Sequence, residues 1–217
     1  MSQLTKTLTD LQKSGKKLKC SFVVTRFVPE STPNDLDILV KKDDFKDFVH
    51  ALESVGYQSS SHDYALGGRK KGAQINLAKK GRVKIDLHND FTWRCSHYLD
   101  LDLLWQNLKK TSIEGVRCLV PRKDYDNFLI MINTIFEKTY FFEKNINFEF
   151  NPIFRDQAKK YGWENTYLKF FGLRPTPRFL PVWFEIYSYF EKWYVISFAY
   201  YFFFRIRYII NKRLPYS

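Results

Sequence analysis

The chain has 217 residues, which is enough for one well-packed core or two small ones. Its 45% hydrophobic and 27% charged residues are typical of globular proteins and exclude wholesale disorder. A formal net charge of +12 favours an anionic partner, such as a nucleotide, a nucleic acid, a phosphorylated sugar or an anionic membrane surface.

Hydrophobic spacing and turn residues predict the elements of the first half of the chain. Leucines at helical spacing near the N-terminus, an apolar run that ends at Pro29, and apolar residues every three or four positions before Gly56 each indicate a separate element. In chain order we expect a helix at 4–17, strands at 19–28 and 34–40, a helix at 42–55, a short strand within 57–68, and a hairpin of strands at 73–77 and 82–87.

The second half of the chain is richer in helices and in aromatic residues. We expect a helix at 99–108, one strand or a strand pair at 113–120, and a helix at 124–139 that begins after Pro121. More than half of the aromatic residues follow position 150. The prediction is an α+β fold, with a small mixed β-sheet core and its helices at 1–120 and a helical portion at 121–217.

Two aspartates lie inside an apolar, strand-like run. Side chains alternate between the two faces of a strand, so Asp35 and Asp37 share one face while Leu36, Ile38 and Val40 line the other. Folding alone gives no reason to hold two carboxylates so close together. The pair is therefore a candidate site for a hard cation, which oxygen ligands bind well.

A later strand repeats this design. Val83, Ile85 and Leu87 point one way, and the side chains that point the other way are Lys84, Asp86 and His88. If the two strands are neighbours, three carboxylates converge, and such a cluster repels itself unless a cation such as Mg²⁺ lies among the oxygens. The pattern favours metal-assisted phosphoryl or nucleotidyl transfer. The alternative is that the acids are simply solvated or protect a strand edge from aggregation.

The order of these elements resembles the nucleotidyltransferase fold of the polymerase-β type. The resemblance is carried by the Asp-X-Asp strand, the helix that ends at Val55-Gly56-Tyr57, the hairpin, and the third aspartate in the run 85–88. Among the branches of that superfamily, the chain is most similar to small prokaryotic nucleotidyltransferase-like proteins, whose runs read Asp-Ile-Asp-Leu-Leu-Val and Val-Asp-Leu-His. The similarity covers residues 4–140.

The resemblance implies a role for each of the three acids. Asp35, Asp37 and Asp86 would bind two Mg²⁺ (or Mn²⁺) ions, which align the α-phosphate of a nucleoside triphosphate for attack by a hydroxyl. Paired metals stabilise the attacking and leaving oxygens of an in-line displacement, so little covalent chemistry is left to the protein. Asp86 would also be a candidate base for the hydroxyl proton.

The phosphate-binding turn of that family is matched only in part. A Gly-Ser step usually precedes the Asp-X-Asp strand, whereas the stretch 19–22 contains Ser21 but no glycine. Ser21 would keep half of that role, and Arg26 or Lys41 would supply positive charge to the phosphates. His88 would orient a carboxylate or contact the substrate. The ordinary alternatives are solvated surface cations and a structural histidine.

Residues 181–213 form an aromatic and basic segment. Its longest uncharged stretch is shorter than the ~18–20 apolar residues that a bilayer span requires. Trp and Tyr interleaved with Arg and Lys are typical of an element that lies on an anionic membrane surface. The alternatives are a helix buried against the helical portion or a dimer partner, and a nucleic-acid-binding surface. With no signal peptide and no zinc-type cysteine spacing, we expect a cytoplasmic protein, either free or membrane-associated.

The sequence therefore supports two functions. The first is a Mg²⁺-dependent nucleotidyltransferase that moves a nucleoside monophosphate from a nucleoside triphosphate to a hydroxyl or phosphate acceptor. The second is a degenerate, non-catalytic nucleotidyltransferase-like protein that binds a nucleotide or a partner and docks on a membrane surface. Retention of three acids favours the enzyme, and the missing glycine before Ser21 favours the second function.

Overall fold

The computed structural model describes residues 1–27, 34–60, 74–93, 96–136 and 148–172. These residues divide into two compact units, and the second unit contains Phe91–Asp100 and the described residues from Asn127 onward. The aromatic segment at 181–213, for which we expected a membrane or partner role, lies outside the described residues. Within the described ranges no helix has both the length and the apolar character needed to cross a membrane.

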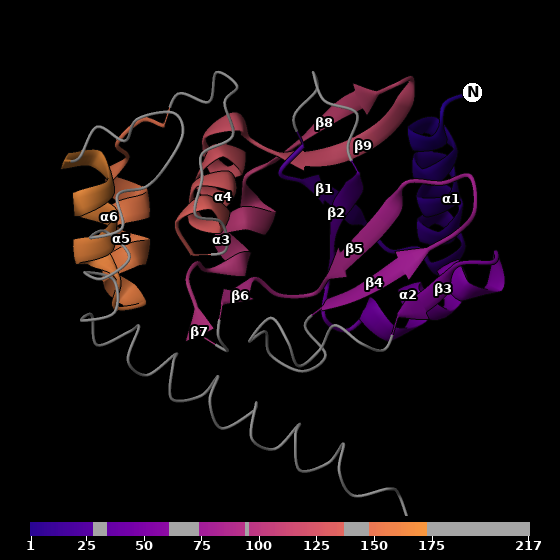
Figure 1. The fold of residues 1–217 in the computed structure, drawn as a ribbon, viewed down its shortest axis with the longest axis horizontal. Helices are drawn as coiled ribbons and strands as arrows, with labels where there is room; N and C mark the ends of the chain where they lie inside the picture. The colour runs from indigo at the N-terminus through magenta and orange to yellow at the C-terminus, as the bar shows by residue number, and fades with distance from the viewer. Residues whose placement is uncertain (28–33, 61–73, 94–95, 137–147, 173–217) are drawn as a thin grey trace, which may run out of the picture. The chain divides into compact units, whose positions relative to one another are not determined.

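A mixed sheet is the centre of the first unit (Figure 1). Its seven strands are β1 (Phe22–Thr25), β2 (Asp35–Val40), β3 (Gln58–Ser60), β4 (Gln74–Ala78), β5 (Lys84–His88), β8 (Leu108–Ile113) and β9 (Val116–Pro121). Their spatial order is β3-β4-β5-β2-β1-β9-β8, in which β2 pairs with β5 and β1 with β9 in parallel, and the other neighbours are antiparallel. The expected α+β fold with a mixed sheet is confirmed.

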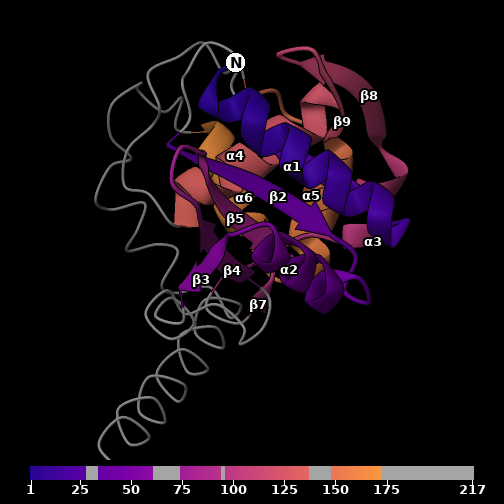
Figure 2. The ribbon, with the colours of Figure 1, turned by 90° about the vertical axis from the view of Figure 1, so that its right-hand side faces the viewer.

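Two helices cover one face of this sheet. Helix α1 (Gln3–Leu18) and helix α2 (Phe45–Ser54) lie side by side across β2 in Figure 2. Leucines of α1 and phenylalanines of α2 share one hydrophobic core with the even-numbered residues of β2 and the odd-numbered residues of β5. The members of these two strands in the core are Leu36, Ile38, Val40, Ile85 and Leu87. The predicted alternation of β2 and β5 is therefore confirmed on its apolar side.

Where one strand or a strand pair was expected at 113–120, the structure has one strand, β9, which pairs with β8, a strand that lies almost wholly before that range. The two residues between them, Glu114 and Gly115, have φ angles of 46° and 81°. Positive φ at both central residues matches the twist of an antiparallel pair, and glycine reaches it without steric cost. The turn therefore joins β9 to a strand that the sequence analysis did not predict. A short helix, α3 (Leu101–Gln106), precedes the hairpin.

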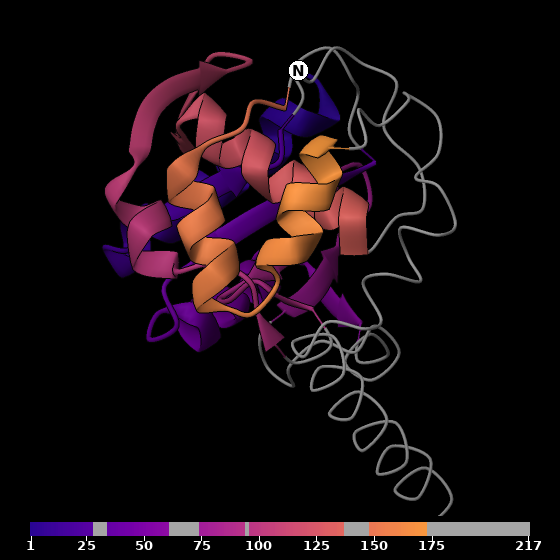
Figure 3. The ribbon, with the colours of Figure 1, turned by 90° about the vertical axis from the view of Figure 1, so that its left-hand side faces the viewer.

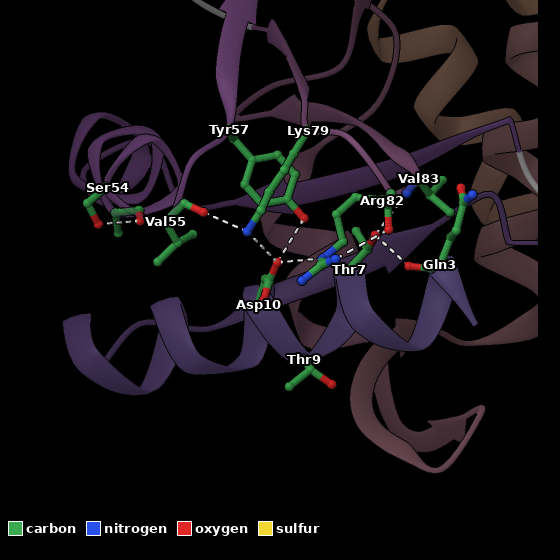
Figure 4. Close-up of polar contacts among 12 residues, drawn as sticks. Gln3, Thr7, Thr9, Asp10, Ser54, Val55, Tyr57, Lys79, Arg82 and Val83 are labelled. Carbon is green, nitrogen blue, oxygen red and sulfur yellow. Dashed lines mark hydrogen bonds and ion pairs between the residues drawn. The ribbon is translucent and has the colours of Figure 1, made fainter. Parts of the chain in front are cut away.

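An ion-pair cluster joins α1 to the β4–β5 hairpin (Figure 4). The Asp10 carboxylate accepts hydrogen bonds from Arg82 Nε at 2.8 Å and Lys79 Nζ at 3.3 Å, and Tyr57 Oη donates to it at 3.4 Å. Burial alone would raise the pKa of Asp10, but these cations hold it below its usual range. The cluster fixes helix α1 to the turn between β4 and β5.

The second unit contains a small hairpin and helices. Its elements are β6 (Thr92–Trp93), β7 (Ser96–His97), α4 (Lys123–Phe136) from Asn127 onward, α5 (Pro152–Lys160) and α6 (Glu164–Gly172). Figure 3 shows α5 and α6 side by side. The Phe128 ring stacks on Phe154 with centroids 4.1 Å apart, and Trp163 Nε1 donates to the carbonyl of Tyr98 at 3.2 Å. Aromatic stacking therefore holds this unit together.

Candidate functional site

The face of the sheet opposite α1 and α2 carries the acidic residues. Because Leu36 and Ile38 point into the core, strand alternation directs Asp35 and Asp37 to the other face. The same alternation on β5 places Asp86 and His88 there, beside the acids of β2. The local sequence thus determines which side of each strand is charged.

The pairing of β2 with β5 brings two carboxylates level with each other. The strands are parallel neighbours, and the Cα of Asp37 lies directly opposite the Cα of Asp86. Neighbouring strands are ~4.8 Å apart, so both side chains leave the sheet at one place. Asp35 stands opposite Lys84, whose Nζ lies 3.6 Å from Asp86 Oδ1. The expectation that these two strands are neighbours is confirmed.

A guanidinium and an imidazole already contact Asp37. Arg26 Nη2 donates a hydrogen bond to Asp37 Oδ1, and His88 Nε2 lies 3.1 Å from the same oxygen. The side chains are 10%, 20% and 4% exposed for Arg26, Asp37 and His88, respectively. Burial by itself would raise the pKa of Asp37, but the Arg26 charge and the His88 hydrogen bond hold it well below its usual range. Asp37 is therefore ionised and neutralised by Arg26 in this conformation.

The turn that follows β1 directs the Arg26 side chain toward Asp37. Arg26 has a φ of 55°, a left-handed conformation that is uncommon for a non-glycine residue. Its backbone N–H donates a hydrogen bond to Asp126 Oδ1 at 2.6 Å. Burial raises the pKa of Asp126 to about 7, while the hydrogen bond from the Arg26 backbone and the Arg26 charge act to lower it. The turn and the first turn of α4 are thus joined through one partly buried carboxyl group.

The other predicted residues lie elsewhere on the strands. Ser21 is exposed and precedes Phe22, whose partner on β2 is Val40, so it lies at the far end of β1 from the acids. Lys41 is exposed at that same end, with Nζ 5.8 Å from the centre of the Trp105 ring. The structure therefore brings Arg26, His88 and the acids together, and it does not bring Ser21 or Lys41 to them.

Two residues beside the acids were not predicted. Thr25 is buried and pairs with Asp37 in the β1–β2 register. It could have been found from the sequence, because a short antiparallel connection brings the last residue of β1, and not Ser21, next to the start of β2. Asp126 had no local signal, since an acid in the first turn of a helix is ordinary.

The chemistry of the acids fits a hard cation. Asp37 and Asp86 are in register and Asp35 lies on the same face, so the available ligands are carboxylate oxygens, which Mg²⁺ and Mn²⁺ prefer. In the described part of the chain, no three His, Cys, Asp or Glu side chains are grouped closely enough to hold a metal ion. In this conformation the Arg26 guanidinium balances the charge of Asp37.

Comparison with known proteins gives a family match. Residues 30–171 match the model of a family described as uncharacterised nucleotidyltransferase. This span includes the three acids, His88 and Asp126, and it begins after Arg26. No curated protein matches the chain.

Two solved structures have a similar chain trace. One is the lincosamide antibiotic adenylyltransferase LnuA with lincomycin bound, at 13% identity and a TM-score of 0.39, covering 56% of this chain and 82% of that chain. The other is the antibiotic-resistance factor ANT(2'')-Ia, at 8% identity and a TM-score of 0.45, covering 78% of this chain and 95% of that chain. The assignment of the chain to a family rests on the family model and not on these two distant structures.

Proposed function

The chain belongs to the nucleotidyltransferase family whose model it matches, and we propose that it transfers a nucleoside monophosphate from a nucleoside triphosphate to a hydroxyl or phosphate acceptor, with Mg²⁺ or Mn²⁺. The observation that carries this proposal is the register of β2 and β5, which sets Asp37 opposite Asp86 with Asp35 on the same face. Three acids on paired strands have no role in the hydrophobic core. Their position is consistent with a site for a metal and a triphosphate.

Asp35, Asp37 and Asp86 would hold the metal. When bound, the metal neutralises charge on the phosphates and favours ionisation of the acceptor. In the reaction, a bond forms between the acceptor oxygen and the α-phosphorus, the bond to the β-phosphate breaks, and pyrophosphate leaves. Asp86, which lies opposite Asp37 on the neighbouring strand, is our candidate for accepting the acceptor proton.

Arg26 and His88 would orient the Asp37 carboxylate and balance its charge before the metal binds. His88 is buried and contacts Asp37 Oδ1, so it restricts the orientation of that carboxylate. Arg26 balances the charge of Asp37 in the present conformation, and its guanidinium has the planar donor set that binds phosphate oxygens. We propose that the guanidinium turns from the carboxylate to the triphosphate when the metal and nucleotide bind. Ser21 and Lys41, at the other end of the strands, take no part in this proposal.

Calorimetric titration of each nucleoside triphosphate with Mg²⁺ tests the metal site, with pyrophosphate release as a second measurement. We expect binding by the wild-type chain and a loss of at least ~10-fold in affinity in Asp35→Asn/Asp37→Asn, because two metal ligands lose their charge. Asp43→Asn/Asp47→Asn is the matched control, since it removes the same charge at two exposed residues near the start of α2. Equal loss in both variants, or no binding by the wild type, would contradict the proposal.

A non-catalytic nucleotide-binding protein is the second candidate. The Arg26–Asp37 ion pair favours it, because the pair balances one acid of the site without a metal. The two candidates differ in their dependence on metal. Binding of a nucleoside triphosphate that persists in EDTA and in Asp35→Asn/Asp37→Asn, without pyrophosphate release, would support the second candidate and exclude the first.

A further inference from the structure

Asp126 is a partly buried acid to which the proposed reaction assigns no role. It lies in the first turn of α4 and accepts a hydrogen bond from the Arg26 backbone N–H at 2.6 Å. An acid in this place usually interacts with the free N–H groups of its own helix. Asp126 instead binds the backbone of a turn that is 100 residues away in the sequence.

The turn that Asp126 binds is strained. A positive φ at arginine persists only where the surrounding structure enforces it, and Arg26 has a φ of 55°. Asp126 Oδ1 accepts a hydrogen bond from the backbone N–H of this same residue, so its carboxyl group is in place to hold the turn.

The direction of the Arg26 side chain follows from this turn. The same residue that donates its backbone N–H to Asp126 donates its guanidinium to Asp37. An extended backbone at Arg26 would continue the alternation of β1 and would direct the side chain to the face of Phe22 and Val24, which lies in the core under α1. The left-handed turn is what brings the guanidinium to the acidic face.

We propose that Asp126 is a positioning residue, which holds the Arg26 turn in its left-handed conformation and thereby keeps the guanidinium at Asp37 and at the triphosphate. The part of this inference that concerns the triphosphate rests on the proposed function. The part that concerns the contact between Arg26 and Asp37 does not. Asp126 touches neither substrate nor metal in this role. We therefore expect the effect of its removal on the site to pass through Arg26.

A double-mutant cycle tests this dependence. Nucleoside triphosphate affinity in the presence of Mg²⁺ is measured by calorimetry for the wild type, Asp126→Ala, Arg26→Gln and the double variant. We expect each single variant to bind ~10-fold more weakly, since one charge-assisted contact is lost, and the double variant to bind like Arg26→Gln alone. Asp126→Asn, which keeps one acceptor oxygen, should stay within ~3-fold of the wild type.

The control is Asp10→Ala, which removes another ion-paired, largely buried carboxylate, but on α1. It should leave the affinity unchanged in both the wild-type and the Arg26→Gln backgrounds. Independent losses that multiply to ~100-fold in the Asp126→Ala/Arg26→Gln variant, or an unchanged affinity in Asp126→Ala, would overturn the positioning role. If Asp126→Ala does not fold, Asp126→Ser takes its place in the cycle.

A metal-free measurement separates this inference from the proposed function. The same four proteins are unfolded with urea in EDTA, and the shifts of the midpoints are compared. We expect the shift caused by Asp126→Ala to become smaller in the Arg26→Gln background, because the turn then no longer holds a guanidinium on Asp37. If the wild type binds no nucleotide but this coupling is present, the proposed function fails and the positioning role stands. If the midpoint shifts are additive, the positioning role fails.

Discussion

Asp37 lies directly opposite Asp86 on two adjacent parallel strands, at the position where β2 and β5 are both central in the sheet. Like charges that face each other across strands are destabilising. The chain tolerates the pair because Arg26 donates to Asp37 and because Lys84 Nζ lies 3.6 Å from Asp86 Oδ1. The acidic pair therefore lowers the stability of the fold, and this is a reason to expect that it has a function.

The first prediction concerns the repulsion between these two acids. Asp86→Asn should raise the free energy of unfolding in EDTA by about 0.5 kcal/mol, since it removes one of two opposed charges. Urea unfolding at low ionic strength measures this change, and added salt should reduce it. The same substitution should weaken the binding of Mg²⁺ and nucleotide. A less stable Asp86→Asn would contradict the prediction and would indicate that the contact with Lys84 dominates.

The second prediction concerns the guanidinium. Arg26→Gln leaves the mostly buried Asp37 without its cation, so we expect a loss of about 2 kcal/mol in the free energy of unfolding without metal. Saturating Mg²⁺ should recover part of this loss, because a metal bound to Asp37 replaces the missing charge. Urea unfolding with and without Mg²⁺ gives the comparison. Arg117→Gln, at an exposed position on β9, is the control and should respond equally in both conditions.

The third prediction is a pH dependence. Burial raises the pKa of Asp126 from 3.8 to about 7. Between these values the unfolded chain releases the proton while the folded chain retains it, so stability is lost as the pH rises through this window. Asn does not titrate, so the free energy of unfolding of Asp126→Asn should rise relative to that of the wild type by about 3 kcal/mol between pH ~4.5 and ~7.5.

Urea unfolding at several pH values measures this difference. Asp156→Asn is the control, because Asp156 is exposed on α5, and its curve should run parallel to that of the wild type. A constant difference between Asp126→Asn and the wild type across the window would contradict the prediction, since it would mean that Asp126 is charged in the folded state at all of these pH values.

The fourth prediction concerns the cluster in Figure 4. Asp10→Ala should lower the free energy of unfolding by about 1 kcal/mol, because Arg82, Lys79 and Tyr57 lose a shared partner. Nucleotide affinity should not change, since the cluster lies between α1 and the hairpin turn. Thermal unfolding and calorimetry give the two readouts. A change in affinity would indicate that α1 controls the position of β5 and of Asp86.

Much of the fold follows from short-range patterns. The alternation around Asp35 and Asp37, the helical spacing that ends near Gly56, and the turn residues before β5 each act within a few positions, and all of these elements are present. Strand β8 was missed, because its residues Leu108–Ile113 are mostly polar and exposed and do not form an apolar run. The left-handed φ angles at Glu114 and Gly115 turn the chain from β8 into β9.

The sequence by itself determined which side chains share a face of each strand, because the period of a strand is a local property. It thereby placed Asp35 and Asp37 on one face of their strand, and Asp86 and His88 on one face of theirs. Only the tertiary structure decided that these two faces adjoin, that Arg26 rather than Ser21 or Lys41 reaches them, and that Asp126 holds the Arg26 turn. Strand register and a hydrogen bond between residues 100 positions apart depend on the packing of the whole unit. No local sequence pattern encodes them.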